Sequence, residues 1–208
     1  MDSDILVNAI VTLAVTIDPI GLAPLFLAVT AGMDRQQRRE VGTRAIITSA
    51  IVLVLFALIG TMILALFGVT LAAFRVAGGL LLFWIAFEMI FERRQQRHEN
   101  TAERAINADQ VRSVAIFPLS IPLIAGPGAI SAVILLSGQM PGIAGAAALI
   151  SIVLAILAIT WVIFIAAERI DRLLGETGRS VLTRLLGVIL SALAVQFVAD
   201  GIKTLAAA

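Results

Sequence analysis

The amino-acid sequence predicts an all-α membrane protein whose six transmembrane helices form two inverted three-helix repeats. Its 208 residues are 60% hydrophobic and only 14% charged, and the mean hydropathy is +1.05. Residues 114–167 contain no Asp, Glu, Lys or Arg, a run far longer than the roughly 20 apolar residues that one membrane helix needs. A soluble bundle is disfavoured, because helices that are apolar on every side would have to be buried completely. Ten-residue segments of alternating polarity, typical of outer-membrane strands, do not occur.

Apolar segments long enough to cross the hydrocarbon core alternate with charged or turn-forming segments along the chain. The six predicted spans are residues 5–31, 44–67, 71–91, 114–137, 142–167 and 182–205. The first span is uncharged except for Asp18, the third has Arg75 in its first turns, and a turn at residues 138–142 sets off the fifth. We expect the first and fourth spans to be broken, at residues 18–24 and 122–128, because proline removes a backbone donor and clashes with the preceding turn.

The distribution of Arg and Lys predicts how the spans are oriented. Three loops, at residues 35–44, 93–112 and 169–184, carry four, five and four arginines, so 13 of the 15 basic residues lie on one side. Only Arg75 and Lys203 fall on the other side. Because short cytoplasmic loops are rich in Arg and Lys, both termini are predicted to face outward. The acidic start of the chain predicts that the first span is retained rather than cleaved as a signal peptide.

Three spans in each half make the two halves enter the membrane from opposite sides, so they can be related only as inverted repeats. The predicted units are residues 1–91, a charged cytoplasmic linker at 92–113, and residues 114–208. Each broken span carries two prolines five residues apart, and a single offset of 103 positions superimposes both pairs. The matching residues are Pro19 with Pro122 and Pro24 with Pro127. Interrupted membrane helices at corresponding positions of two halves point to the substrate site of a transporter.

Asp18 lies near the centre of the first predicted span. An Asp at the centre of a membrane helix is unfavourable by roughly 2.5 to 3.5 kcal/mol, so such residues usually mark function. The functional interpretation is that Asp18 contacts a substrate or a coupling ion near the midplane. The structural interpretation is that it caps a second half-helix that begins at Pro19. The two interpretations are compatible.

The breaks supply the other candidates for a substrate site. Backbone groups freed at a break inside a membrane need partners in the protein or in a water-filled cavity. The N-termini of half-helices can hold a carboxylate, and the freed carbonyl groups could hold a cation. The simpler alternative is two proline kinks that serve only helix packing. The predicted substrate-binding residues are Asp18, Pro19, Gly21, Pro24, Ser120, Pro122, Gly126, Pro127, Gly128 and Ser131.

Other polar residues inside the spans are candidates for a substrate or ion pathway. Asn8, Thr12 and Thr16 lie at i, i+4 and i+8, and therefore on one face of the first half-helix. They could line a pathway, and hydrogen bonding between helices explains them equally well. Gln196, deep in the sixth span, is the fourth candidate. Glu88, near the cytoplasmic end of the third span, is expected to snorkel or to pair with an Arg.

The residue content excludes several functional classes. The chain has no Cys and a single His, His98 in the charged linker, which excludes thiolate metal sites, His-based metal clusters and a Ser-His-Asp triad inside the membrane. The segment at 126–128 lacks the Lys and Ser or Thr of a phosphate-binding loop. We therefore expect no enzymatic activity, no metal and no cofactor. With a formal net charge of +1, nucleic acid is not an expected partner. The expected partners are the bilayer, a small-molecule substrate and a coupling H⁺ or Na⁺.

The two break segments carry a family resemblance. Residues 18–26 (DPIGLAPLF) and 118–131 (PLSIPLIAGPGAIS) resemble the signature segments of the MarC/SnatA family, and the resemblance extends over the whole chain. It implies a multi-pass protein of the bacterial or archaeal inner membrane. The SnatA branch implies ion-coupled transport of small neutral amino acids such as glycine and alanine. The family is also distantly similar to the LysE/RhtB amino-acid exporters.

The leading hypothesis is a secondary transporter of small neutral amino acids or similar zwitterions. The half-helix N-termini would hold the carboxylate, Asp18 would meet the ammonium group or the coupling H⁺ or Na⁺, and the two halves would rock around this site. A non-transporting scaffold or regulatory protein is one alternative, and a passive small-solute channel is another. The sequence leaves open the substrate, the direction of transport, the coupling ion, the oligomeric state and any role in antibiotic resistance.

Overall fold

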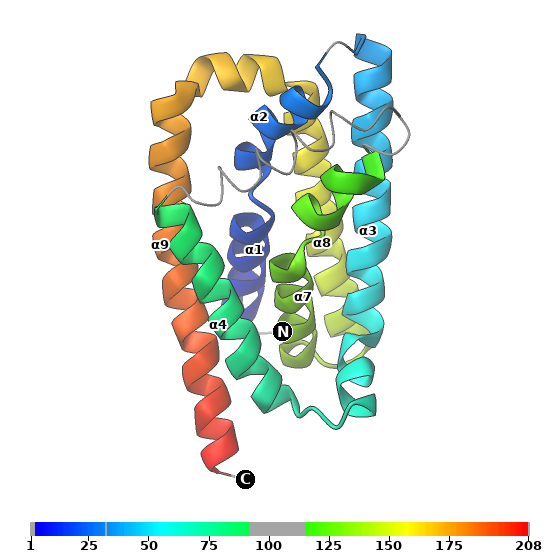
Figure 1. Cartoon of the computed structure of the whole chain (residues 1–208). Helices are drawn as coiled ribbons and strands as arrows, with labels where there is room; N and C mark the ends of the chain where they lie inside the picture. The colour runs from blue at the N-terminus through cyan, green and yellow to red at the C-terminus, as the bar shows by residue number, and fades with distance from the viewer. Residues whose placement is uncertain (1–2, 32, 92–114, 208) are drawn as a thin grey trace.

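The computed structural model describes residues 3–31, 33–91 and 115–207, apart from the side chains of residues 116–118, 171, 172, 174 and 176 (Figure 1). The elements are α1 (Ser3–Ile17), α2 (Pro19–Val29), α3 (Arg35–Leu66), α4 (Leu71–Ile90), η1 (Ala115–Ile124), α7 (Pro127–Gln139), α8 (Gly142–Ile165) and α9 (Ala167–Ala206). Every element in this part of the chain is a helix, which confirms the predicted all-α class. The predicted linker at 92–113, with His98, lies outside the described residues.

Five stretches in the described part of the chain are long and apolar enough to cross a membrane. They are Ser3–Val29, Arg35–Leu66, Leu71–Ile90, Gly142–Ile165 and Thr177–Ala206. The predicted fourth span is divided between η1, a π-helix of 10 residues, and α7, an α-helix of 13 residues. Each of these is shorter than the roughly 20 residues that one crossing needs. Length and composition therefore give five spans where the sequence predicts six.

The breaks are narrower than the proline pattern predicts. The first is confined to Asp18, and α2 continues through Pro24 without interruption. The expectation that Pro24 helps to break the helix is therefore wrong: proline removes one backbone donor, and here packing of α2 against α8 and α9 keeps that turn helical. Pro122 likewise lies inside η1, after a cis peptide bond, so the second break falls at Ala125 and Gly126.

Two helices extend beyond the predicted apolar spans at the arginine-rich end of the molecule. Helix α3 begins at Arg35 rather than Arg44, because Asp34 and Gln37 form a capping box. The backbone N–H of Gln37 donates to Asp34 Oδ1 over 2.8 Å, and that of Asp34 donates to Gln37 Oε1 over 3.0 Å. Helix α9 begins before its apolar span and turns sharply at Gly175, whose φ of 59° suits glycine. Its first part runs across the top of Figure 1 before the helix descends beside α4.

Helices of the two halves pack in antiparallel pairs. Gly79 of α4 lies against the carbonyl oxygen of Ala194, and Gly201 of α9 lies against that of Ala72; a Cβ added to either glycine would sit 2.9 Å from that oxygen. Residue numbers therefore rise along α4 as they fall along α9. Helices α3 and α8 also run in opposite directions in Figure 1, and Trp161 Nε1 donates to Thr43 Oγ1 over 3.0 Å between them.

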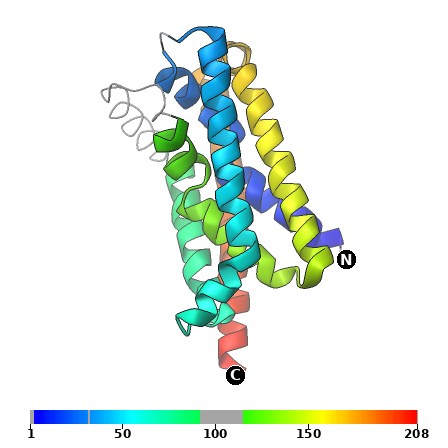
Figure 2. The same ribbon diagram turned by 90° about the vertical axis from the view of Figure 1, so that its right-hand side faces the viewer.

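One face of α3, the helix nearest the viewer in Figure 2, carries a stripe of exposed apolar residues. Its members recur every three or four residues and are each at least half exposed: Ile47, Ile51, Leu55, Leu58, Met62 and Leu66. A soluble monomer rarely exposes so long an apolar stripe. The stripe suits contact with lipid chains, in agreement with the composition.

Candidate functional site

The backbone at the first break is built around Asp18. This residue has φ 54° and ψ 64°, a left-handed conformation that ends α1 and starts α2. Its Oδ1 accepts a hydrogen bond from the backbone N–H of Gly21 over 3.1 Å, and Pro19 occupies the first helical position. This is the capping geometry considered from the sequence. A Cβ at position 21 would collide with the Asp18 carboxylate, so the cap requires glycine there. Asp18 is only 5% exposed.

The second break brings a helix N-terminus against the first. Gly126 has an extended backbone and caps α7 without a side-chain hydrogen bond, and Pro127 is the first residue of the helix. A Cβ at Gly128 would collide with Ile85 and lie 3.2 Å from Cγ2 of Thr16. The absence of a side chain at Gly128 therefore lets the first turn of α7 contact the last turn of α1.

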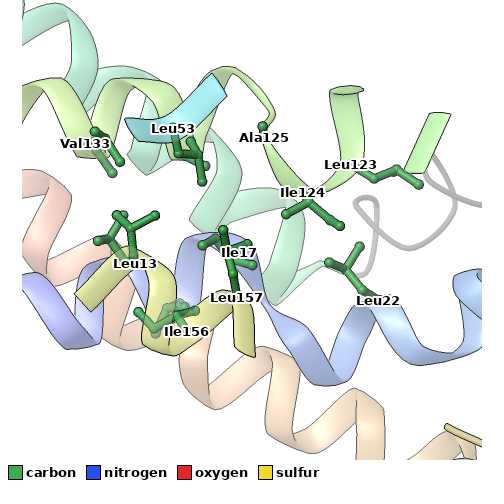
Figure 3. Close-up of a cluster of buried hydrophobic side chains, with 14 of the residues drawn as sticks. Leu13, Ile17, Leu22, Leu53, Leu123, Ile124, Ala125, Val133, Ile156 and Leu157 are labelled. Atoms are coloured by element: carbon green, nitrogen blue, oxygen red, sulfur yellow. The ribbon is translucent and has the colours of Figure 1, made fainter. Parts of the chain in front are cut away.

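Apolar side chains fill the space between the two breaks. Ile17 and Leu22 flank Asp18, and in Figure 3 they face Ile124 and Ala125 from the second break, with Leu157 of α8 beside them. All five are at most 1% exposed. In this conformation the two breaks are therefore packed against each other.

The polar residues of α1 lie on the face that leads to the first break. Thr12 Oγ1 donates to Asn8 Oδ1 over 2.9 Å, and Thr16 Oγ1 donates to the carbonyl oxygen of Thr12 over 2.5 Å. Thr12 and Thr16 are buried and Asn8 is half-buried. The structure thus places all three predicted pathway residues in one row that ends beside Asp18.

Ser120 contacts a residue that sequence reasoning missed. Its hydroxyl lies 2.9 Å from that of Ser49 in α3, and both residues are fully buried. Because the Ser49 hydroxyl donates to the carbonyl oxygen of Ala45 over 2.8 Å, Ser120 is the donor between the two serines. A lone serine in a long apolar helix carries no local signal for such a contact. Ser131, one turn into α7, is also buried, at 8% exposed.

Two polar residues lie elsewhere than the sequence suggested. Gln196 is exposed on α9 and its Nε2 donates to Asp200 Oδ1 over 2.9 Å, so it does not join the residues at the breaks. Its neighbour Phe197 takes the buried side of α9. Glu88 is 6% exposed, so it does not snorkel, and pairing with an Arg, the other expectation for this residue, stays a prediction. Helix α9 packs closely across this end of α4, where Gly187 approaches Met89, the residue next to Glu88.

Comparison with known proteins covers nearly the whole chain. Residues 3–206 match the model of a family described as MarC family integral membrane protein. A UPF0056 membrane protein of Methanocaldococcus jannaschii is 36% identical over 92% of this chain and 84% of its own length. The UPF0056 membrane protein YvbG of Bacillus subtilis is 35% identical over 95% of this chain and 94% of its own length. YhcE of Escherichia coli, also named a UPF0056 membrane protein, is 33% identical over 90% and 86%. No solved structure matches the chain.

Proposed function

Because this chain belongs to the MarC family of integral membrane proteins, we propose that it is a secondary transporter of small neutral amino acids or similar small zwitterions in the inner membrane. The relatives are membrane proteins of bacteria and archaea whose names give no substrate. The proposal is therefore carried by the chemistry of the breaks. We expect the protein to bind and move its substrate without changing it covalently.

The observation that carries the proposal is the buried Asp18 at the break between α1 and α2. A charge buried this deeply in a membrane span is unfavourable and usually functional. An ionised carboxylate accepts several hydrogen bonds at once, so capping Gly21 is compatible with holding a cation. Asp18 would meet the ammonium group of the substrate, or the coupling H⁺ or Na⁺.

The N-terminus of α7 would hold the carboxylate of the same substrate. The first N–H groups of a helix have no partner within it, and the helix dipole favours negative charge there. At the N-terminus of α2 the Asp18 side chain already accepts a hydrogen bond from a backbone N–H group, whereas Gly126 gives the N-terminus of α7 no side-chain cap. The two breaks thus differ in charge, and a zwitterion complements that difference.

Transport would require the two halves to move relative to each other, because apolar side chains close the space between the breaks here. The antiparallel pairing of α4 with α9 and of α3 with α8 supports an inverted repeat, with η1 and α7 together forming a sixth crossing. Rocking of such repeats around a central site is the usual mechanism of alternating access. The arginine-rich ends of α3 and α9 would then face the cytoplasm, with both termini outside.

Dense packing at the breaks also favours a second candidate, a membrane scaffold or regulatory protein that transports nothing. In that case Asp18 and the glycines serve only to bring α1, α2 and α7 together. This candidate makes the opposite prediction for every solute, and one experiment separates the two.

That experiment is uptake of radiolabelled alanine by proteoliposomes that contain the purified protein. We expect uptake that saturates with alanine concentration and rises when an H⁺ or a Na⁺ gradient is imposed. Uptake no greater than in protein-free liposomes, for alanine and glycine under both gradients, would support the scaffold. Flux that rises linearly with concentration and ignores both gradients would instead identify a passive channel.

A further inference from the structure

A cavity of about 380 Å³ opens at the arginine-rich end of the molecule, away from the two breaks. Its charged lining residues come from the start of α3 and from the junction of α8 with α9: Arg35, Arg38, Arg39, Glu168 and Arg169. Four guanidinium groups face one carboxylate, which leaves three positive charges in excess. Like charges gathered in one cavity repel one another, and a bound anion would relieve that repulsion.

Two of the four arginines, Arg38 and Arg39, are held by contacts within the cavity. Arg38 Nη1 donates to Glu168 Oε1 over 2.6 Å. The Nε of Arg38 is buried and has no hydrogen-bond partner among the described residues. Arg39 lies over the ring of Trp161, with its guanidinium carbon 5.6 Å from the ring centre. The guanidinium groups of Arg38 and Arg39 are thus positioned before any ligand arrives. The planar fork of a guanidinium group matches the oxygens of a phosphate.

The rest of the cavity is apolar. Phe26 of α2 and Phe164 of α8 stack with their ring centres 4.3 Å apart and their planes within 2° of parallel. Leu27 and Ile165 complete this part of the wall, and Ile165 is 57% exposed. A soluble anion would gain nothing from such a wall, whereas an acyl chain would. Arg and Trp together at the end of membrane helices are also typical of the headgroup level of a bilayer.

We propose that this cavity binds the headgroup phosphate of an anionic phospholipid, with the arginines around the phosphate and the first acyl carbons against Ile165 and Leu27. Basic pockets between membrane helices on the cytoplasmic side are suited to such headgroups. This inference does not depend on the proposed transport activity. Since Phe26 belongs to α2, the lipid would contact the half-helix that starts at Asp18.

Binding of defined lipids to purified, delipidated protein in a neutral detergent tests the proposal, with native mass spectrometry as the readout. The probes are phosphatidylglycerol and phosphatidylcholine with identical acyl chains. Phosphatidylglycerol is expected to bind about tenfold more tightly, since phosphatidylcholine offers a phosphate without net negative charge.

Arg39→Gln is expected to weaken phosphatidylglycerol binding about tenfold, the loss expected for one charge-assisted hydrogen bond. The matched control is Arg44→Gln. It removes the same charge from the same helix, but Arg44 pairs with Glu40 outside the cavity lining. Its phosphatidylglycerol affinity should stay within about twofold of the wild-type value, as for a screened surface charge.

Glu168→Gln should act in the opposite direction, because it removes the carboxylate that competes with the phosphate for Arg38. The control is Glu40→Gln, which makes the same charge change outside the lining. Tighter binding is expected only for Glu168→Gln.

Three results would overturn the proposal. Equal weakening by Arg39→Gln and Arg44→Gln would show a diffuse charge effect, and equal binding of the two lipids would remove the requirement for an anion. The third result concerns inorganic phosphate. If it raised the melting temperature as much as phosphatidylglycerol does, and Arg39→Gln reduced both effects equally, the cavity would be a site for a soluble anion.

Discussion

Replacing Asp18 with Asn is expected to reduce alanine uptake into proteoliposomes at least tenfold while the protein stays folded. The reduction follows from the loss of one charge-assisted contact to the ammonium group or coupling ion, which is worth about 1.5 to 3 kcal/mol. Folding should survive because Asn caps helices as well as Asp does and tolerates the left-handed backbone that position 18 adopts. Uptake and melting temperature are measured on the same preparation.

The matched control for this substitution is Asp34→Asn. Asp34 is also the N-cap of a helix and also accepts from a backbone N–H, but it is exposed at the start of α3. Asp34→Asn makes the same chemical change at a cap far from the breaks, so its alanine uptake should equal that of the wild type. Unchanged uptake and unchanged coupling in a folded Asp18→Asn protein would remove Asp18 from the transport mechanism. Its only role would then be to cap α2.

A large loss of stability is expected from Gly79→Leu, in the contact between α4 and α9. The new Cβ would lie 2.8 Å from Cγ2 of Val198 and 2.9 Å from the carbonyl oxygen of Ala194. A side chain can move aside, but the backbone oxygen cannot without parting the helices. Overpacking of this kind costs about 1 to 3 kcal/mol or more, so we expect a clearly lower melting temperature in detergent.

Ala77→Leu is the control for that substitution. Ala77 lies two residues earlier in α4 and is exposed, so the same added side chain points away from α9 and should change stability by no more than about 0.5 kcal/mol. Adding Val198→Ala to Gly79→Leu should restore stability only in part, because the Ala194 oxygen remains in place. Equal melting temperatures for Gly79→Leu and Ala77→Leu would show that the α4–α9 contact has room for a leucine side chain.

The length and apolar character of the spans could be predicted from the sequence, because the bilayer sets both. Where the helices begin was harder to predict. The first turns of α3 are rich in arginine and glutamine, so hydropathy placed the start of the predicted span at Arg44. The Asp34-x-x-Gln37 capping box was a local signal that could have placed the true start. At Pro24 the sequence predicted a break where the helix continues, because a proline pattern cannot show that neighbouring helices will keep a turn intact.

The residues at the candidate site were only partly predictable, because the rotation of an evenly apolar helix leaves no periodic signal. Asn8, Thr12 and Thr16 could be grouped from their spacing, and they do share a face. Gln196 had no such companions, and it lies on the exposed side of α9. Ser49 and the arginine cavity depend on contacts between distant segments, to which no local pattern points.

The measurement that tests the central claim most directly is the melting temperature of the purified protein with alanine and with two analogues, ethylamine and propionate. Ethylamine lacks the carboxylate that the α7 N-terminus would hold, and propionate lacks the ammonium group that Asp18 would meet. The proposed site predicts that alanine stabilises the wild-type protein, by about 2.7 kcal/mol at a hundred times its Kd. Neither analogue should do so at the same concentration, and Asp18→Asn should lose the effect of alanine. Equal shifts from alanine and an analogue, or no shift from alanine or glycine at two pH values with and without Na⁺, would contradict it.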